Sequence, residues 1–499
     1  MRLRMPAALR VWWSCSNTST ETRSSTYRDR GIRIRSMSSL SPQFTQALRS
    51  LVGESNVLSD PADTWVYGYD NSRKHTAPDA VAFATTHAEV AAIVRLCCEH
   101  GVPLTARGRG TGTSGGSIPL RAGVVLSLER MNRIVSVDAA NRALTAEPGA
   151  TNQAVQDAAR ASGFFWAPDP TSAAFCTIGG NIALNAGGPR AVKYGATREN
   201  VLGLRAVTGD GAEIRTGTYT TKGAVGYDLT RLLIGSEGTL AIITEAVLRL
   251  TPLPESRRTL QAAYGRVQDA AAAVARVMAQ PVTPCALEMM DSAAIDIICN
   301  QSRAELPPGA GALLMIEVDG PEAGMDSMLL SITRALGGTG LVEIRAARSA
   351  DEIKELWAAR KALSPALRTI APNKLNEDVV VPVSRIADLI EGLGELSRRY
   401  GIPIVNFGHA GNGNLHVNLL YDSQDPQQQQ NARPAVSAVF DLVLALGGTL
   451  SGEHGVGREK RDYIDRAIDA ATLDLMRRIK ILFDPNGILN PEKVFPSQQ

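Results

Sequence analysis

PLTARGRGTGTSGG, residues 103–116, is the stretch of this 499-residue chain that decides between two folds. It contains the pattern G-x-G-x-x-G at Gly110, Gly112 and Gly115, which in a dinucleotide-binding fold opens a helix that meets a diphosphate. Here Pro119 and the strand pattern GVVLSL follow instead. The sequence therefore disfavours that fold and leaves two interpretations open, an ordinary glycine-rich turn or a nest of backbone N–H groups for a diphosphate.

Two more glycine-rich segments lie further along the chain, TIGGNIALNAGG at residues 177–188 and GSEGTLAIIT at residues 235–244. Small residues let backbone amides approach a flat or charged ligand without obstruction by side chains. Three such segments within about 140 residues predict one long ligand that is held largely by backbone groups.

Short apolar runs alternate with helical patterns from residue 80 to about residue 250, which predicts an α+β fold with mostly antiparallel strands. Thr86 and Glu89 form a capping box for a helix that follows them. Asp210-Gly211 is expected as the two-residue turn of a hairpin. After the proline-containing boundary TPLPESRR, residues 251–258, further strand and helix patterns predict a second sheet.

The N-terminal 36 residues differ in composition from the rest, because they hold eight arginines, no lysine and only two acidic residues. This composition is typical of a mitochondrial transit peptide, and the alternative is upstream sequence in front of a start at Met37. We expect a disordered leader (1–36), an N-terminal helical segment (37–76), a first domain (77–254) and a second domain (255–499). Without the leader, 44 Lys+Arg face 48 Asp+Glu, so no basic excess indicates a nucleic-acid partner.

The six cysteines have neither disulfide-framework nor metal-site spacing, so we expect reduced thiols. No run of about 18 apolar residues predicts a transmembrane helix. The expected location is cytoplasmic, with peripheral contact to the inner membrane, or the mitochondrial matrix if the leader is real.

GHAGNGNLHVNLL, residues 408–420, carries two of the six histidines of the chain. Strand alternation places His416 and Asn418 on one face, and His409 ends the preceding strand pattern. SGEHGVGREK, residues 451–460, adds Glu453 and His454 in another glycine-rich turn. Two imidazoles and a carboxylate suit Zn, Mn or Fe with open coordination positions, so the pattern favours a divalent-metal site over separate structural histidines.

A helix predicted over SADEIKELWAARKALSP, residues 349–365, places Ile353, Trp357, Arg360 and Ser364 on one stripe. An arginine on an apolar stripe either extends its guanidinium to solvent or binds an anion such as a carboxylate. The spacing alone leaves both interpretations open.

In this order and spacing, the three glycine-rich segments resemble the flavin-binding domain of the vanillyl-alcohol oxidase / p-cresol methylhydroxylase (PCMH) superfamily. Over roughly residues 45–495 the chain is similar to the D-lactate dehydrogenase, glycolate oxidase flavoprotein subunit and D-2-hydroxyglutarate dehydrogenase group. The resemblance implies a PCMH-type FAD-binding domain of two subdomains, followed by an α/β substrate domain (FAD-linked oxidase C-terminal type) with a large antiparallel sheet.

The resemblance also implies FAD as the cofactor. Some relatives link the flavin to a histidine of the first loop, but no histidine lies between residues 101 and 408, so we expect noncovalent FAD. The expected FAD contacts are Arg107, Gly108, Gly110, Thr111, Gly112, Thr113, Pro168, Thr177, Gly180, Asn181, Asn185, Gly187, Gly188, Glu237, Gly238 and Ile242.

For the second domain, the resemblance implies His409, His416 and Glu453 as metal ligands and His454 as the catalytic base. It makes Arg360 the clamp for the substrate carboxylate and Asn418 a second polar contact. A cation at the substrate hydroxyl lowers its pKa, so that a base can accept the proton while the C2 hydride passes to flavin N5. The expected reaction is oxidation of a D-2-hydroxyacid to the 2-oxoacid.

One departure from the family bears on the substrate. Where the 2-hydroxyglutarate branch carries a lysine two residues before the D-x-x-x-P strand, this chain has Asn376, with Lys374 further upstream. This difference favours a small monocarboxylate such as D-lactate or glycolate over a dicarboxylate.

Two other functions fit a flavin-binding fold, an alkyl-glycerone-phosphate synthase type without net oxidation and a flavin electron-transfer subunit without a substrate site. The first type shows a run of histidines where this chain has Gly452-Glu453-His454, and the second would leave the histidine cluster empty. The electron acceptor stays open among oxygen, a quinone, a cytochrome and an electron-transfer flavoprotein, and the sequence is compatible with a homodimer.

Overall fold

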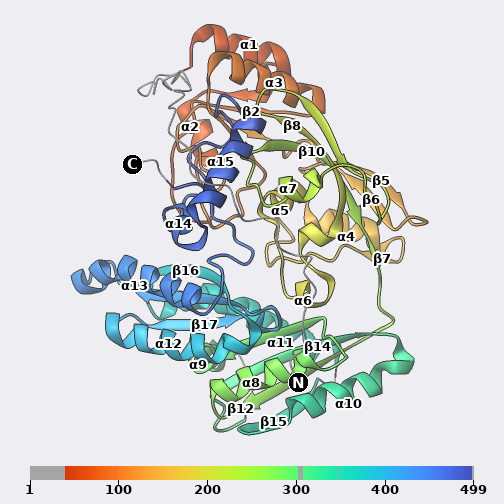
Figure 1. Ribbon diagram of the computed structural model, residues 1–499, viewed down its shortest axis with the longest axis vertical. Helices are drawn as coiled ribbons and strands as arrows, with labels where there is room; N and C mark the ends of the chain where they lie inside the picture. Colours follow the sequence, from red (N-terminus) through yellow and green to blue (C-terminus); the bar gives the residue numbers. More distant parts are fainter. Residues whose placement is uncertain (1–39, 302–306, 348, 497–499) are drawn as a thin grey trace, which may run out of the picture. The chain divides into compact units, whose positions relative to one another are not determined.

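The computed structural model describes residues 40–301, 307–347 and 349–496, so the predictions for residues 1–36 lie outside the described part. The described residues form two domains, with four β-sheets and covering helices (Figure 1). Among them, no helix combines the length and the apolarity needed to cross a bilayer.

The first subdomain is a small sheet that packs on α1 and α3, with the short α2 beside them. The capping box of Thr86 and Glu89 begins the long helix of this subdomain, as predicted. Three of the strands are parallel, which differs from the antiparallel expectation, because a helix makes the connection between the first two. In sheet order the strands are β1 (Val57–Leu58), β2 (Ala80–Phe83), β4 (Val124–Ser127) and β3 (Leu104–Arg107), and the helices are α1 (Pro42–Val52), α2 (Pro61–Thr64) and α3 (His87–His100).

The second subdomain is an antiparallel sheet around the buried Trp166. The predicted hairpin at residues 201–217 is present, but its turn is the three residues 209–211, because Thr208 N–H donates to Ala212 O. In sheet order the strands are β5 (Ile134–Asp138), β6 (Ala143–Ala146), β10 (Ala241–Arg249), β8 (Val201–Thr208) and β9 (Glu213–Gly217). Other elements are α4 (Asn152–Arg160), α5 (Ile178–Leu184), α6 (Ala191–Tyr194), α7 (Leu229–Leu233) and the pair β7 (Phe164–Phe165) and β11 (Thr251–Pro252).

The second domain is built on a seven-stranded sheet in which every neighbouring pair is antiparallel. In sheet order the strands are β15 (Leu341–Ala346), β12 (Ser256–Tyr264), β14 (Ala312–Gly320), β13 (Ala286–Asp291), β17 (Ile404–Gly408), β18 (Asn414–Tyr421) and β16 (Asn373–Val380). One face packs on α8 (Val267–Ala279), α10 (Met325–Leu336), α12 (Ile386–Tyr400) and α13 (Pro426–Ala445). The other packs on α9 (Ser292–Gln301) and α11 (Ala350–Ala366).

Strand alternation in β18 determines toward which face of the sheet the His416 side chain points. Leu415, Val417 and Leu419 belong to the core under α12 and α13, whereas Leu420 belongs to the core under α11. His416 shares the face of Leu420, as the sequence predicts, and therefore looks toward the α11 side of the sheet.

The C-terminal segment returns to the N-terminal half of the described chain. Ile479 and Phe483 of α15 (Ala470–Phe483), which follows the short α14 (Ile464–Ala467), pack against the core of the second subdomain. Figure 1 shows the blue α15 beside the yellow-green elements of that subdomain. Leu489 then pairs with Leu104 at the edge of the first sheet.

A buried ion pair joins the two domains at the end of β14. Asp319, whose side chain is 1% exposed, accepts from Lys193 Nζ at 2.5 Å and from Tyr194 Oη at 2.9 Å. Replacing Asp319→Asn leaves Lys193 with an uncompensated charge, so we expect a loss of about 3 kcal/mol or more in the free energy of unfolding, measured by urea denaturation.

Glu322→Gln is the matched control, because the pair of Glu322 with Arg258 is exposed on both sides. It should cost about 1 kcal/mol or less. Equal costs for the two variants would contradict a stabilising role of the buried pair.

Candidate functional site

One cavity of about 860 Å³ runs between the glycine-rich segments and the α11 face of the large sheet. Its volume lies within the range of about 300–1,000 Å³ that is usual for ligand sites. The predicted site residues that line it are Arg107, Gly108, Gly110, Thr111, Gly112, Thr113, Thr177, Gly180, Asn181, Glu237, Gly238, Ile242, Arg360, His409, His416, Glu453 and His454. The sequence therefore predicted side chains from both domains that the structure brings to one cavity.

The glycines of the first two segments allow the chain to pack backbone on backbone. A Cβ on Gly108 would lie 2.3 Å from Thr177 Oγ1, and a Cβ on Gly110, whose φ is +65°, would meet the Arg107 guanidinium. Thr177 caps α5 by accepting from Gly180 N–H. The two segments thus form one wall of the cavity, and larger residues at these glycines would separate them.

Four predicted FAD contacts do not line the cavity. Pro168 accepts a hydrogen bond from Asn152, and Asn185 ends α5 and accepts from Arg198 N–H. Gly187 lies against the Glu453 carboxylate, where a Cβ would come within 3.1 Å of Oε2, and Gly188 packs on Asp169. These residues shape the segments behind the cavity wall.

Asn418 does not line the cavity either. Its side chain is fully buried, and Nδ2 donates to the carbonyl oxygens of Val405 at 3.1 Å and His416 at 3.0 Å. The Nδ2 group therefore serves the β17–β18 pair, whereas the buried Oδ1 has no hydrogen-bond partner among the described residues.

Glu237 lines the cavity, but its carboxylate is hydrogen-bonded to another part of the chain. Its carboxylate accepts from the backbone N–H groups of Val456 at 2.7 Å and Gly457 at 2.8 Å. Burial raises the pKa of this carboxyl group, and the two N–H donors oppose the shift. The third glycine-rich segment is thereby tied to the turn that carries Glu453 and His454.

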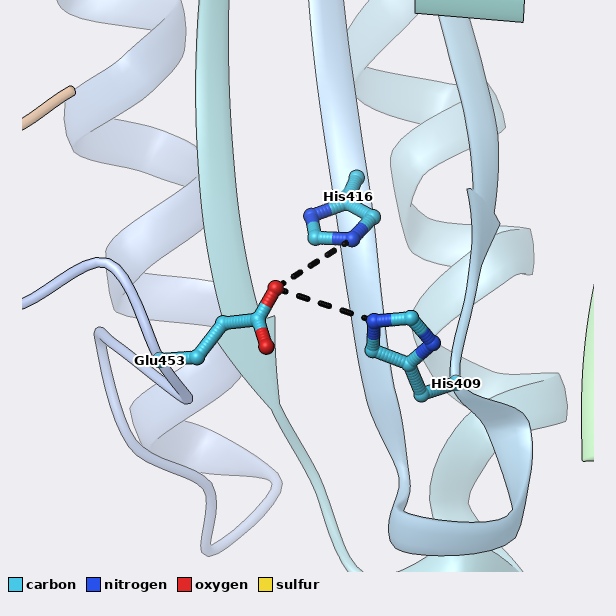
Figure 2. Close-up of side chains that lie close together, drawn as sticks. All are labelled: His409, His416 and Glu453. Carbon is cyan, nitrogen blue, oxygen red and sulfur yellow. Dashed lines mark ion pairs between the residues drawn. The ribbon is translucent and has the colours of Figure 1, made fainter. Parts of the chain in front are cut away.

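His409, His416 and Glu453, which all line the cavity, converge on one another (Figure 2). Nε2 of His409 lies 3.6 Å and Nε2 of His416 lies 3.9 Å from Glu453 Oε1, and one ligand atom of each residue falls within 4.8 Å of the others. His409 directly follows β17, His416 is in β18 after the short turn Ala410–Asn412, and Glu453 follows α13. Three chain segments thus supply one donor set.

The imidazoles of this cluster differ in charge. Burial alone would lower the pKa of His409, but the Glu288 carboxylate outweighs burial and raises it to about 10. Burial, together with the neighbouring His409 and His454, lowers the pKa of His416 to about 3. His416 is therefore neutral, and its buried Nδ1 has no hydrogen-bond partner among the described residues.

This donor set fits a divalent metal ion. Two imidazole Nε2 atoms and a carboxylate oxygen face one point, which is the arrangement of a site with open positions. His454 lies beside it, with Nε2 also 3.9 Å from Glu453 Oε1 and its ring stacked on that of His416 at 5.4 Å. A base and a cation can therefore reach the same substrate atom.

Arg360 and its stripe face the cavity from α11. Ile353, Trp357 and Ser364 line it together with Arg360, as the helical spacing predicts. The guanidinium donates from Nε and Nη2 to Glu288 Oε2 at 2.8 Å.

Sequence patterns did not single out three residues that hold the site together. Asp378, which is fully buried, accepts the backbone N–H groups of Gly452, Glu453 and His454 on one oxygen. Glu288 joins Arg360 to His409, and Asn490 donates to the carbonyl oxygens of Gly116 and Glu237. An acid inside an apolar run, as Glu288 is in ALEMM at residues 286–290, is a sequence signal for such a residue, because a buried charge must be paired.

Comparison with known proteins covers both halves of the chain. Residues 78–217 match the family described as FAD binding domain, and residues 253–494 match FAD linked oxidases, C-terminal domain. The chain is 38% identical over 451 residues to the glycolate oxidase subunit GlcD of Bacillus subtilis, covering 90% of this chain and 96% of that protein. It is 37% identical over 442 residues to D-lactate dehydrogenase of Archaeoglobus fulgidus, covering 87% and 96%.

The fold is similar to that of p-cresol methylhydroxylase with substrate bound, with a TM-score of 0.77 at 18% identity, covering 91% of this chain and 96% of that one. The likeness confirms the fold that the glycine-rich segments predict.

Asn490 provides a test of the flavin site. Asn490→Asp keeps the shape and tolerates the left-handed backbone (φ +43°), but removes both donors to the glycine-rich segments. We expect the dissociation constant of FAD to rise about tenfold, since each lost hydrogen bond to a buried carbonyl costs roughly 1 kcal/mol. Titration of apoprotein with FAD, followed by flavin fluorescence, measures it.

Asn486→Asp is the control, because this amide donates to Cys98 outside the cavity. It should leave FAD affinity unchanged. An unaltered FAD affinity in Asn490→Asp would show that the C-terminal segment does not support the site.

Proposed function

Since the chain belongs to the FAD-linked oxidase family and is an FAD-dependent oxidoreductase of the glycolate oxidase / D-lactate dehydrogenase type, we propose that it oxidises a small D-2-hydroxyacid to the 2-oxoacid with a divalent cation. The observation that carries the proposal is the convergence of His409, His416, Glu453 and His454 in the cavity that Arg360 lines. D-lactate and glycolate are the proposed substrates.

The residues that would hold FAD are those of the three glycine-rich segments, with Asn490 supporting two of them. His409, His416 and Glu453 would hold the cation. When bound, FAD supplies an acceptor for the C2 hydride, and the cation supplies a charge that lowers the pKa of the substrate hydroxyl.

His454 is the proposed catalytic base. Its Nε2 faces the same carboxylate oxygen as the two metal-ligand imidazoles, so it lies next to the point where the substrate hydroxyl would be held. Asp378 fixes the backbone of residues 452–454 through three N–H groups and thereby orients the His454 ring. The proton of the hydroxyl would pass to His454 as the hydride leaves C2.

Arg360 is the proposed partner of the substrate carboxylate. Its bonds to Glu288 use Nε and Nη2, and the guanidinium has further N–H donors for a second carboxylate. Beyond Arg360, the cavity wall carries the neutral Ser364 and Asn376 as well as the cations Lys361 and Arg257, of which Arg257 pairs with Glu317. Lys374 donates to Ser364 from behind, which leaves no lysine directly at the position of Asn376.

Anaerobic mixing of the FAD-loaded protein with D- and L-2-hydroxyacids tests the proposal. We expect D-lactate or glycolate to bleach the flavin absorbance, L-lactate to react at least about a hundredfold more slowly, and removal of metal by a chelator to abolish the reaction. Readdition of Zn²⁺, Mn²⁺ or Fe²⁺ should restore it.

Failure of every D-acid to reduce the flavin at any metal content would sink the proposal. Such a result would favour an enzyme without net oxidation or an electron-transfer subunit.

Asn376 tests the proposed preference for a monocarboxylate. Asn376→Lys would place a cation in the cavity wall, so we expect kcat/KM for D-2-hydroxyglutarate to rise about tenfold or more relative to D-lactate. Asn376→Met is the control, since it adds length without charge. If both variants change the two substrates in the same ratio, Asn376 does not determine specificity.

A further inference from the structure

We propose that Glu288 is a positioning residue that couples carboxylate binding at Arg360 to metal binding at His409. The inference deepens the proposed function and rests on it. It concerns how two parts of one site communicate, through a side chain whose two oxygens accept from Arg360 and His409.

Glu288 lies between the two groups and uses a different oxygen for each. Oε2 accepts from Arg360 Nε and Nη2 at 2.8 Å, and Oε1 accepts from His409 Nδ1 at 2.5 Å. The side chain is fully buried, so water does not compete for either oxygen. One carboxylate thus links α11 to the end of β17.

The sheet holds this arrangement in place. β13 pairs with β17 through Met289 opposite Gly408, which brings Glu288 next to His409. The guanidinium of Arg360 lies over the Phe407 ring, 4.6 Å from its centroid. Arg360 is therefore held between an aromatic face and a carboxylate, and its position follows that of Glu288.

The bond to His409 selects the nitrogen that is free for a ligand. A carboxylate that accepts from Nδ1 keeps a hydrogen on that atom, so Nε2, which faces Glu453 at 3.6 Å, is the nitrogen that would exchange its proton for a cation. A neutral amide in place of Glu288 would hold this orientation less strongly.

The two binding events are coupled because Arg360 and His409 both donate to the one carboxylate of Glu288. A cation on Nε2 polarises the Nδ1–H group of His409 and strengthens its bond to Glu288. Glu288 then holds Arg360 less tightly, and the guanidinium becomes available to a substrate carboxylate. By reciprocity, a carboxylate on Arg360 must raise the affinity for the cation by the same factor.

Two binding measurements without turnover test the inference, on the FAD-loaded wild type and Glu288→Gln. In the first, Zn²⁺ affinity is determined by competition with a chromophoric chelator. We expect Glu288→Gln to bind Zn²⁺ about 10- to 100-fold more weakly than the wild type.

In the second, propionate, which has a carboxylate but no hydroxyl, is titrated with and without Zn²⁺ while the flavin absorbance is followed. Zn²⁺ should lower its dissociation constant about fivefold or more in the wild type. In Glu288→Gln the same ratio should be close to one.

Glu317→Gln is the matched control. Glu317 is also buried and lines the same cavity, but it pairs with Arg257 and Trp357 and contacts none of the three ligand side chains. It should change Zn²⁺ affinity less than about threefold and keep the propionate ratio of the wild type. Equal effects in both variants, or an unchanged ratio in Glu288→Gln, would overturn the inference.

If Glu288→Gln fails to fold, a second variant still tests the inference. The double variant Glu288→Gln with Arg360→Gln carries no uncompensated guanidinium, and it should retain FAD while Zn²⁺ binding stays weakened to the same extent. Wild-type Zn²⁺ affinity in this double variant would contradict the role of Glu288. If the wild type itself bound no Zn²⁺, the proposed function would fail, whereas binding alike in all variants would overturn this inference alone.

Discussion

The site depends on the pairing of buried carboxylates, each of which joins chain segments that are far apart in sequence. The Asp378 carboxylate accepts from the backbone N–H groups of Glu453 and His454, and the Glu237 carboxylate accepts from those of the next residues of that turn. Glu288 joins β13 to α11 and β17. A buried charge without a partner costs several kcal/mol, so these pairings fix the positions of the side chains that carry the chemistry.

The two domains contribute different things to the cavity. The flavin-binding half supplies backbone from glycine-rich segments, and the second domain supplies imidazoles and carboxylates on one face of a sheet. The C-terminal segment connects them, because Asn490 donates to both Gly116 and Glu237. Cofactor site and substrate site are therefore parts of one hydrogen-bonded assembly.

Local patterns predicted much of this arrangement, because strand alternation and helical spacing determine the face of His416 and of the α11 stripe. They could not reveal Glu288, whose partners lie 72 and 121 positions away in the chain. Alternation gives the face of Asn418 but not its hydrogen-bond partners, and in the structure its Nδ2 donates to neighbouring backbone. Ion pairs between residues that are distant in sequence, and the hydrogen-bond partners of a buried side chain, are seen only in the folded structure.

The most direct measurement of the central claim is X-ray absorption at the zinc edge of FAD-loaded protein that was reconstituted with one equivalent of Zn²⁺. The account predicts stoichiometric metal with two imidazole nitrogens at about 2.0–2.1 Å and a carboxylate oxygen, and loss of one imidazole in His416→Ala. Zinc that does not bind stoichiometrically, or that binds without imidazole, would contradict it.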